Sequence, residues 1–222
     1  MGPDKEFYHL HLSSEALAIG ERIKGGTFRP CITTLPSSTL AGAFADYFPG
    51  LKIAAVGFLK SGTYQKMEIP YSPRDRRTDS SLLPLTIQCL VPSADVPFVE
   101  GDIFLPCDDH SEQAVTRLPL TIYLGAFRYK GLGRCRIELN CRLVPGSPAQ
   151  PSSYTYVRGF FAGRIRESEL EAFGIQVEKP RFGYLFEPDS DNPRTGSYRR
   201  SIFEGSLVKA PSFLVSGEYI YD

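Results

Sequence analysis

The sequence predicts an α+β fold in which short strands outnumber helices. The 222-residue chain contains 20 glycines and 18 prolines. Together these two residue types make up about 17% of the chain, above the ~12% that is usual in globular domains. Because such residues mark turns, we expect many short elements rather than long helices. Hydrophobic residues make up 42% of the chain, which is enough for a core in one elaborated domain or two small ones. The composition excludes a chain that is disordered throughout and argues against an all-helical bundle.

The N-terminal elements are predicted by hydrophobic spacing. Residues 7–12 (FYHLHL) alternate with period two, which is typical of a strand and puts His9 and His11 on one face. Residues 36–48 carry apolar side chains at helical spacing, so we expect a helix there. Ser37 or Ser38 would cap its start, and the Pro-Gly pair at residues 49–50 would end it.

The remaining elements are expected to be mostly strands. A Pro- and Arg-rich stretch at residues 70–81 reads as a long loop or an extended hairpin arm, and residues 145–153 as a linker. A capping-box pattern at residues 168–171 predicts a short helix that Gly174 closes. Strands or extended pieces are expected over residues 52–59, 82–91, 118–126, 134–143, 182–186, 201–208 and 212–221.

Charge and composition limit the partners and the compartment. Lys and Arg number 25, as do Asp and Glu, so the net charge is zero, which excludes a protein that binds polyanions through overall charge. The N-terminus lacks a signal-peptide pattern, and no stretch approaches the ~18 apolar residues of a membrane span. We therefore expect a cytoplasmic protein that does not contact a membrane. The five cysteines contain no C-x-x-C pair, so we expect reduced, mostly buried thiols.

The motif most suggestive of function lies at residues 124–136 (LGAFRYKGLGRCR). It holds four cations and no acid, and its glycines would let a ligand approach the backbone, where exposed N–H groups meet phosphate oxygens. Its two aromatic residues would offer faces for base stacking, so the motif suits single-stranded nucleic acid. The spacing fits neither phosphate-binding nor dinucleotide-binding loops, and a solvated hairpin is the alternative. The candidate contacts are Phe127, Arg128, Tyr129, Lys130, Gly131, Gly133 and Arg134.

Other positions offer weaker signals. Ser37 and Ser38 would stand at a helix start, an ordinary anion site, although simple capping explains them equally well. The six acids between residues 95 and 112 fit no metal-binding loop, so we expect neither a metal nor another cofactor. His9 and His11 could form a ligand pair or act as general acid and base, with a structural role as the alternative.

Three segments together resemble the RAMP superfamily of CRISPR-associated proteins: residues 7–12, residues 35–43 (LPSSTLAGA) and residues 124–139. Residues 180–208 further resemble Cas-five-like subunits of type III effector complexes, especially the III-D-like branch. The resemblance implies a ferredoxin-like (RRM-like) βαββαβ core over residues 1–145 with a late Gly-rich loop. It also implies an inserted hairpin or thumb arm around residues 61–81, and a β-rich extension or reduced second subdomain over residues 146–222.

The resemblance implies a non-catalytic, RNA-binding subunit that caps the 5′ handle of the crRNA. Such a subunit bridges a large Cas-ten-type subunit to Cas-seven-type backbone subunits and meets target RNA only indirectly. Gly131, Gly133 and Arg134 would then lie against handle phosphates beside Arg128 and Lys130, and the arm would contribute Arg74, Arg76 and Arg77. Two alternatives stay open: a Cas-six-like, metal-independent endoribonuclease that uses His9 or His11, and a Cas-seven-like backbone subunit.

Overall fold

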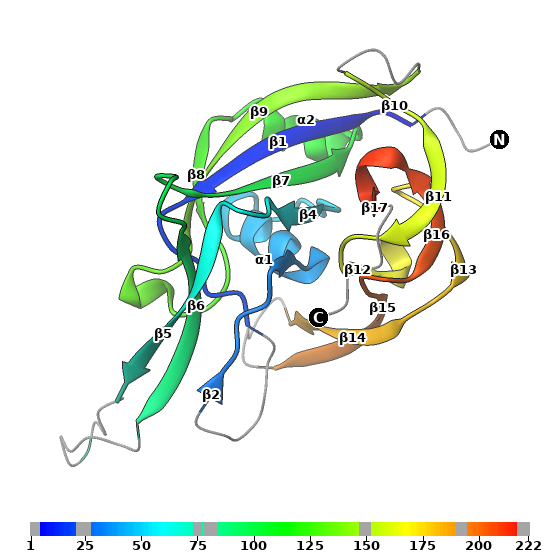
Figure 1. Cartoon of the computed structure of the whole chain (residues 1–222). Helices are drawn as coiled ribbons and strands as arrows, with labels where there is room; N and C mark the ends of the chain where they lie inside the picture. The colour runs from blue at the N-terminus through cyan, green and yellow to red at the C-terminus, as the bar shows by residue number, and fades with distance from the viewer. Residues whose placement is uncertain are drawn as a thin grey trace.

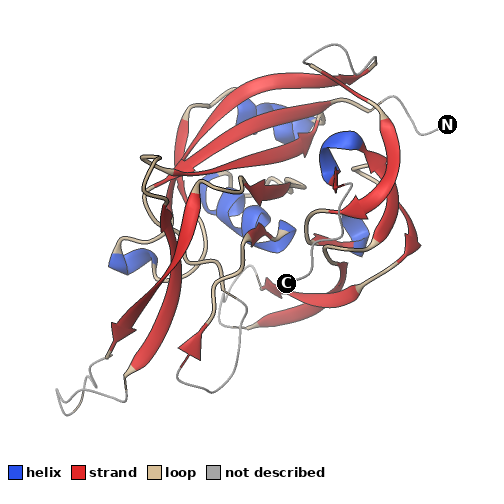
Figure 2. Cartoon of the chain, viewed as in Figure 1, coloured by secondary structure: helices blue, strands red, loops and turns tan. Residues whose placement is uncertain are grey.

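The computed structural model describes residues 5–20, 28–72, 77, 84–146, 152–189 and 195–216. In this part of the chain strands dominate, and the α-helices are α1 and α2 (Figures 1 and 2). None of the described helices is long and apolar enough to cross a membrane. All five cysteines are free, and Cys31, Cys89 and Cys135 are buried, which confirms the expectation of mostly buried thiols.

The largest sheet has the strand order β10-β9-β1-β7-β4-β3, with β8 also paired to β9. Its four central strands, β9, β1, β7 and β4, are antiparallel to one another, whereas β10 at the edge pairs with β9 in parallel. Because α1 connects β1 to β4 and α2 connects β7 to β9, this unit has the βαββαβ connectivity of ferredoxin-like folds. Its elements are β1 (Phe7–Ser14), β3 (Thr34–Leu35), α1 (Ser37–Tyr47), β4 (Val56–Leu59), β7 (Val99–Pro106), α2 (Asp109–Val115), β8 (Leu120–Tyr123), β9 (Arg134–Pro145) and β10 (Ser153–Tyr154).

The two faces of this sheet belong to two hydrophobic cores. On β1, Leu10 and Leu12 face the core that includes Phe44 of α1. Phe7 points the other way and packs with Phe161 and other residues of the C-terminal segment. Since the side chains of a strand alternate between faces, the period of two in residues 7–12 serves both cores. The C-terminal segment thus covers part of the sheet face opposite the helices.

The C-terminal segment forms two smaller sheets, with strand orders β13-β16-β11-β17 and β12-β15-β14. The expected helix at residues 168–171 is wrong, because only a short 3₁₀ turn, η2, forms there, and the expected strand at residues 201–208 is interrupted by a turn. The elements are β11 (Tyr156–Phe161), β12 (Ile165–Arg166), η2 (Glu167–Glu169), β13 (Gln176–Lys179), β14 (Phe182–Pro188), β15 (Gly196–Ile202), β16 (Leu207–Pro211), η3 (Ser212–Leu214) and β17 (Val215–Ser216).

A hairpin arm projects from the body at the lower left of Figure 1. It consists of β5 (Tyr64–Tyr71) and β6 (Leu85–Pro92) in continuous antiparallel register, with β2 (Phe28–Arg29) parallel to β6. Backbone hydrogen bonds between Leu17 and Leu90, 2.7 and 2.9 Å long, tie β6 to the segment that follows β1. The predicted contacts Arg74 and Arg76 lie outside the described residues, whereas Arg77 is described and exposed.

Candidate nucleic-acid interface

The loop at residues 124–136 joins β8 to β9 and is fixed by its own backbone. Gly133 has φ +85° and is buried, and its N–H donates to the carbonyl of Ala16 over 2.7 Å. Gly131 has φ +84°, and its N–H donates to the carbonyl of Arg128 over 3.1 Å. The expectation that these two glycines present exposed N–H groups to phosphate is therefore wrong, because both groups are already bonded within the protein. The glycines are needed for the left-handed turns that close the loop.

The cations at the centre of this loop contact two other elements. Residues 128–130 form the 3₁₀ turn η1 (Arg128–Lys130). The Arg128 guanidinium lies 2.6 Å from the Asp46 carboxylate in the last turn of α1. The Lys130 ammonium lies 4.6 Å from the ring centroid of Tyr71, and the Phe127 ring meets the same tyrosine edge-on at 6.4 Å. Because Tyr71 ends β5, the loop and the arm, which the sequence offered as separate RNA contacts, adjoin. The side chain of Tyr129 lies outside the described part.

Arg134 lines a different surface from this group. It stands exposed at the start of β9 and borders a polar hollow of about 580 Å³ on the sheet. His11, Glu100, Arg136 and Glu138 also line this hollow, and Arg136 forms an ion pair with Glu138 over 2.5 Å. The seven residues predicted in the loop therefore do not form one continuous patch.

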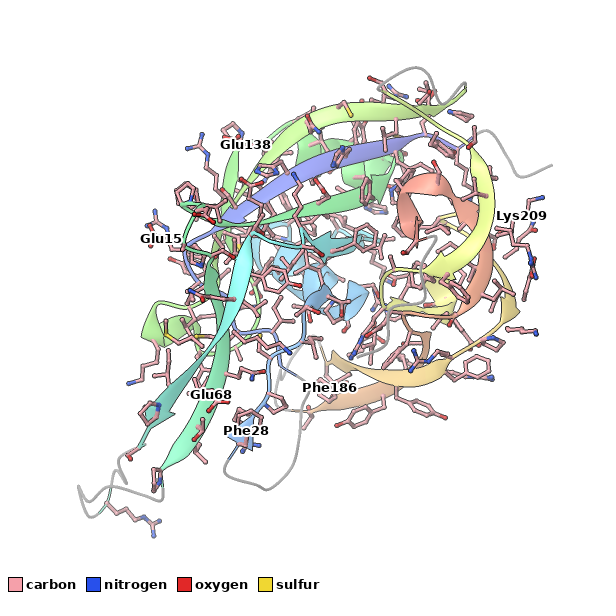
Figure 3. All side chains as sticks on the ribbon, in the orientation of Figure 1. Glu15, Phe28, Glu68, Glu138, Phe186 and Lys209 are labelled. Atoms are coloured by element: carbon pink, nitrogen blue, oxygen red, sulfur yellow. The ribbon has the colours of Figure 1, made fainter. Side chains whose placement is uncertain are left out.

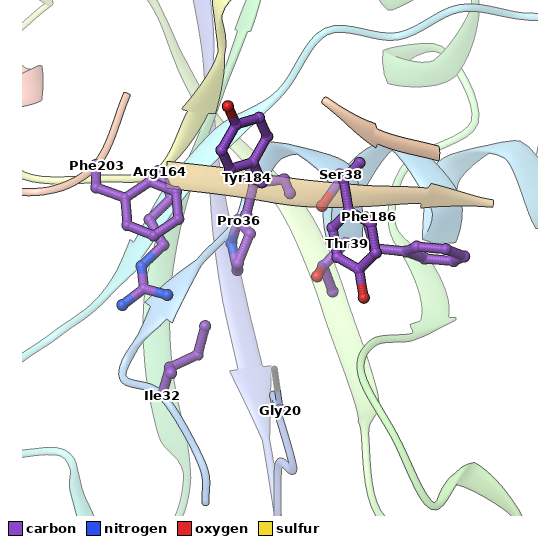
Figure 4. Close-up of a pocket in the computed structure, with 11 residues that line it drawn as sticks. Gly20, Ile32, Pro36, Ser38, Thr39, Arg164, Tyr184, Phe186 and Phe203 are labelled. Atoms are coloured by element: carbon purple, nitrogen blue, oxygen red, sulfur yellow. The ribbon is translucent and has the colours of Figure 1, made fainter. Parts of the chain in front are cut away.

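The start of α1 separates the two predicted serines. The N-cap residue is Pro36, and no side chain caps the helix, so the predicted serine cap is wrong. Ser37 is completely buried; its N–H donates to the carbonyl of Arg164 over 2.9 Å, and its hydroxyl accepts from the N–H of Arg166 over 3.2 Å. The predicted RNA contact of Ser37 conflicts with this burial. Ser38 instead lines a pocket of about 410 Å³ together with aromatic side chains of the C-terminal segment (Figure 4).

Both ring nitrogens of His9 lie within hydrogen-bonding distance of other side chains. Its Nε2 lies 2.8 Å from the Asp102 carboxylate, its Nδ1 lies 3.1 Å from the Asn140 amide nitrogen, and its ring stacks on Phe104 at 4.8 Å. Burial alone would raise the pKa of Asp102, but the hydrogen bond from His9 and the charge of Lys60 outweigh it and lower this pKa. The arrangement crosslinks three strands of the sheet and accounts for His9 structurally.

Sequence reasoning missed two groups of aromatic residues. Tyr71 was not linked to the loop, because no local pattern reveals a contact across 56 positions. The alternating aromatic residues of β14 predicted a strand, but the alternation also signalled that Phe182, Tyr184 and Phe186 share one face. Among the described residues, no group of three or more His, Cys, Asp and Glu side chains is placed to hold a metal ion.

Comparison with known proteins finds similarity in structure alone. No family model and no curated protein matches this chain. A chain in the cryo-EM structure of the Type III-B Cmr-beta bound to cognate target RNA and AMPPnP, state 1, superposes with a TM-score of 0.59. The match has 10% identity and covers 90% of this chain and 86% of that one. The likeness is one of fold.

Two further structures give similar matches. A chain of the Type III-B Cmr-beta bound to cognate target RNA has a TM-score of 0.55 at 10% identity, covering 91% of this chain and 86% of that one. A chain of a CRISPR RNA-guided surveillance complex has a TM-score of 0.46 at 12% identity, covering 95% and 93%. The expected α+β fold class is confirmed in part: the described residues are mostly β, with the helices α1 and α2 and several sheets, and their fold is similar to that of a chain in a Type III-B Cmr-beta structure.

Proposed function

We propose that this chain is a non-catalytic, RNA-binding subunit of a type III CRISPR effector complex. In this role it caps the 5′ handle of the crRNA and bridges a large Cas-ten-type subunit to Cas-seven-type backbone subunits. The observation that carries the proposal is the extent of the fold match, 90% of this chain against 86% of a Type III-B Cmr-beta chain. Residues 7–145 make up less than two thirds of the sequence, so the match extends beyond the βαββαβ unit into the C-terminal sheets.

The adjoining loop and arm support the RNA-binding part of the proposal. Proteins that bind single strands combine cations with aromatic faces. Lys130, Phe127 and Tyr71 bring both into contact, with Arg128 on the same turn and Arg77 exposed farther along the arm. Arg134 adds a further exposed cation at the start of β9, beside a hollow that both arginines and glutamates line. RNA would then follow the side of the molecule where β8, η1 and the arm lie.

The acidic stretch before and within α2 supports the presence of a protein neighbour. Of its six acids, Asp102 binds His9, and Asp108 caps α2 by accepting from the Ser111 N–H over 2.8 Å. Asp95, Asp109 and Glu112 are exposed. Exposed acids at these positions favour contact with a basic protein surface over contact with RNA.

The non-catalytic part of the proposal is supported by His9. A general base must present an available nitrogen to the proton that it removes, and both ring nitrogens of His9 are engaged. We therefore expect repeat RNA to stay intact when it is incubated with the purified protein without metal. Specific cleavage that is lost on His11→Ala would overturn this part and favour the Cas-six-like alternative.

The RNA-binding part is tested in the co-expressed complex. We expect the triple variant Arg128→Glu, Lys130→Glu, Arg134→Glu to lose the crRNA, and each single variant to lower the salt slope of RNA binding by about 0.7 per lost phosphate contact. The matched control is Lys209→Glu, an exposed cation on β16 across the molecule from the arm (Figure 3). Unchanged crRNA content in the assembled triple variant would refute the proposed RNA-binding role of the loop.

A further inference from the structure

One face of the β14–β15 hairpin is unusually rich in exposed aromatic side chains. The register pairs Tyr184 with Arg200 and Phe186 with Tyr198, and residues directly opposite one another in a β-pair share a face. Exposure reaches 65% for Tyr184, 53% for Tyr198 and 48% for Phe182. We call Phe182, Tyr184, Phe186, Tyr198 and Arg200 the aromatic face. Arg200 is its one charged member, and its guanidinium lies 3.6 Å from the ring centroid of Phe182.

A pocket of about 410 Å³ opens beside this face. Three members of the aromatic face line it: Tyr184, Phe186 and Tyr198. Its other walls include Ser38 and Thr39 from α1, which lie on the opposite side of the pocket from Phe203 in the view of Figure 4. The pocket volume lies near the lower end of the ~300–1,000 Å³ range of ligand pockets. It suits one base with its sugar and is too small for several stacked nucleotides.

The charges around the pocket favour a neutral, flat group inside it. Arg164 borders the pocket, but its guanidinium is bonded to both carboxylate oxygens of Glu204 at 2.7–3.0 Å. The net charge of this pair is therefore zero. Arg200 lies on the aromatic face outside the pocket, 3.5 Å from Glu167. A nucleobase meets rings and hydroxyl groups in such a pocket, while its phosphate stays at the rim near a cation.

Exposed aromatic clusters on a soluble protein mark a binding surface. Rings interleaved with arginine are the composition that single-stranded nucleic acid requires, because every base has a face that stacks. We infer that the pocket between α1 and the β14–β15 hairpin takes one unstacked nucleobase of single-stranded RNA, and that the aromatic face stacks the base beside it. This inference rests on the proposed function and adds an RNA contact separate from the loop at residues 124–136.

The test uses the full chain and a fluorescent single-stranded adenine oligonucleotide. The chain contains no tryptophan, so Tyr184→Trp introduces a single reporter at the most exposed member of the face. We expect the tryptophan emission to fall when the oligonucleotide is added. It should stay unchanged with an abasic oligomer that carries the same number of phosphates. Tyr184→Ala and Tyr198→Ala should each weaken binding about 5- to 150-fold, the range for loss of one stacked base, while Tyr184→Phe stays within about twofold.

Leu139→Ala is the control for loss of an exposed apolar side chain, because Leu139 is 46% exposed on β9 and does not line the pocket. Wild-type RNA affinity in Tyr184→Ala, or equal quenching by the abasic oligomer, would overturn the inference. So would loss of a protein subunit from the complex with RNA affinity intact, which would make the face a protein interface. If the loop variants lose RNA and the pocket variants do not, this inference alone fails. If the pocket variants lose RNA and the loop variants do not, the proposed RNA-binding role of the loop fails and the inference about the pocket is supported.

Discussion

Replacing Glu204 with alanine should destabilise this protein severely. The Glu204 carboxylate accepts hydrogen bonds from Nε and Nη2 of Arg164 at 2.7–3.0 Å, and the two side chains are 11% and 9% exposed. An arginine stays charged at any pH near neutrality. The substitution therefore removes the carboxylate that accepts three hydrogen bonds from this buried charge.

We expect Glu204→Ala to lower the free energy of unfolding by about 3–5 kcal/mol, the usual cost of breaking a buried pair. The matched control is the Arg158–Glu178 pair, which has a similar distance of 2.8 Å but is 65% and 38% exposed. Because water solvates that arginine once its partner is removed, Glu178→Ala should cost less than about 1 kcal/mol. Burial, and not the bond length, accounts for the difference.

Urea unfolding of the full chain measures both values. The double variant Arg164→Met, Glu204→Leu should regain most of the lost free energy, since replacing a whole buried pair by apolar side chains is often neutral. Equal losses in Glu204→Ala and Glu178→Ala would refute the reasoning. So would a double variant that is less stable than Glu204→Ala alone.

Three other substitutions test separate parts of the structure. Asp46→Asn releases Arg128 and should raise affinity for single-stranded RNA about 1.5- to 5-fold, the equivalent of one surface ion pair, in a titration at low salt; lower affinity would contradict this. Gly131→Ala and Gly133→Ala both place alanine at a φ near +85°, which costs roughly 1–2 kcal/mol. A Cβ at Gly133 would also lie 2.0 Å from a carbonyl oxygen, whereas a Cβ at Gly131 would meet open space. In urea unfolding, Gly133→Ala should therefore lose at least ~2 kcal/mol more free energy of unfolding than Gly131→Ala. Equal losses in the two variants would exclude the steric cause. The lowered pKa of Asp102 adds stability that is present above the ordinary value of 3.8 and is lost as the pH falls through the lower folded value. The advantage of wild type over Asp102→Asn in free energy of unfolding should thus be smaller at pH 3 than at pH 6, and a constant advantage would refute the assignment.

The fold was predictable where one local pattern determines an element. Period two in residues 7–12 gives β1, and the apolar stripe that includes Phe44 gives α1. The strands near residues 52–59, 82–91 and 134–143 appear as β4, β6 and β9, with ends shifted by a few residues. The capping-box pattern at residues 168–171 failed: η2 begins earlier, at Glu167, its N-cap residue is Arg166, no side chain caps it, and the chain turns at Gly174.

The candidate site was less predictable, because it depends on partners that are distant in sequence. No local rule shows that Asp46 meets Arg128, 82 positions away, or that Ser37 is buried against the segment that contains Arg164. The glycines of the loop at residues 124–136 suggest an approach to phosphate, but the structure uses their freedom to close the turn. Composition indicates which chemistry is available, and the tertiary contacts decide which of those groups are already occupied.

Several of the cations that balance the charge of the chain are paired with acids within the fold. Arg128, Arg136 and Arg158 each contact a carboxylate. RNA phosphates would compete with these carboxylates, so each such contact adds less affinity than an unpaired cation would. Stacking on exposed rings is not weakened in this way, because Tyr184 and Tyr198 already face water. A subunit built like this would hold RNA weakly through charge alone and would depend on base stacking and on neighbouring subunits to fix the strand, which suits a component of an assembly better than a protein that binds RNA by itself.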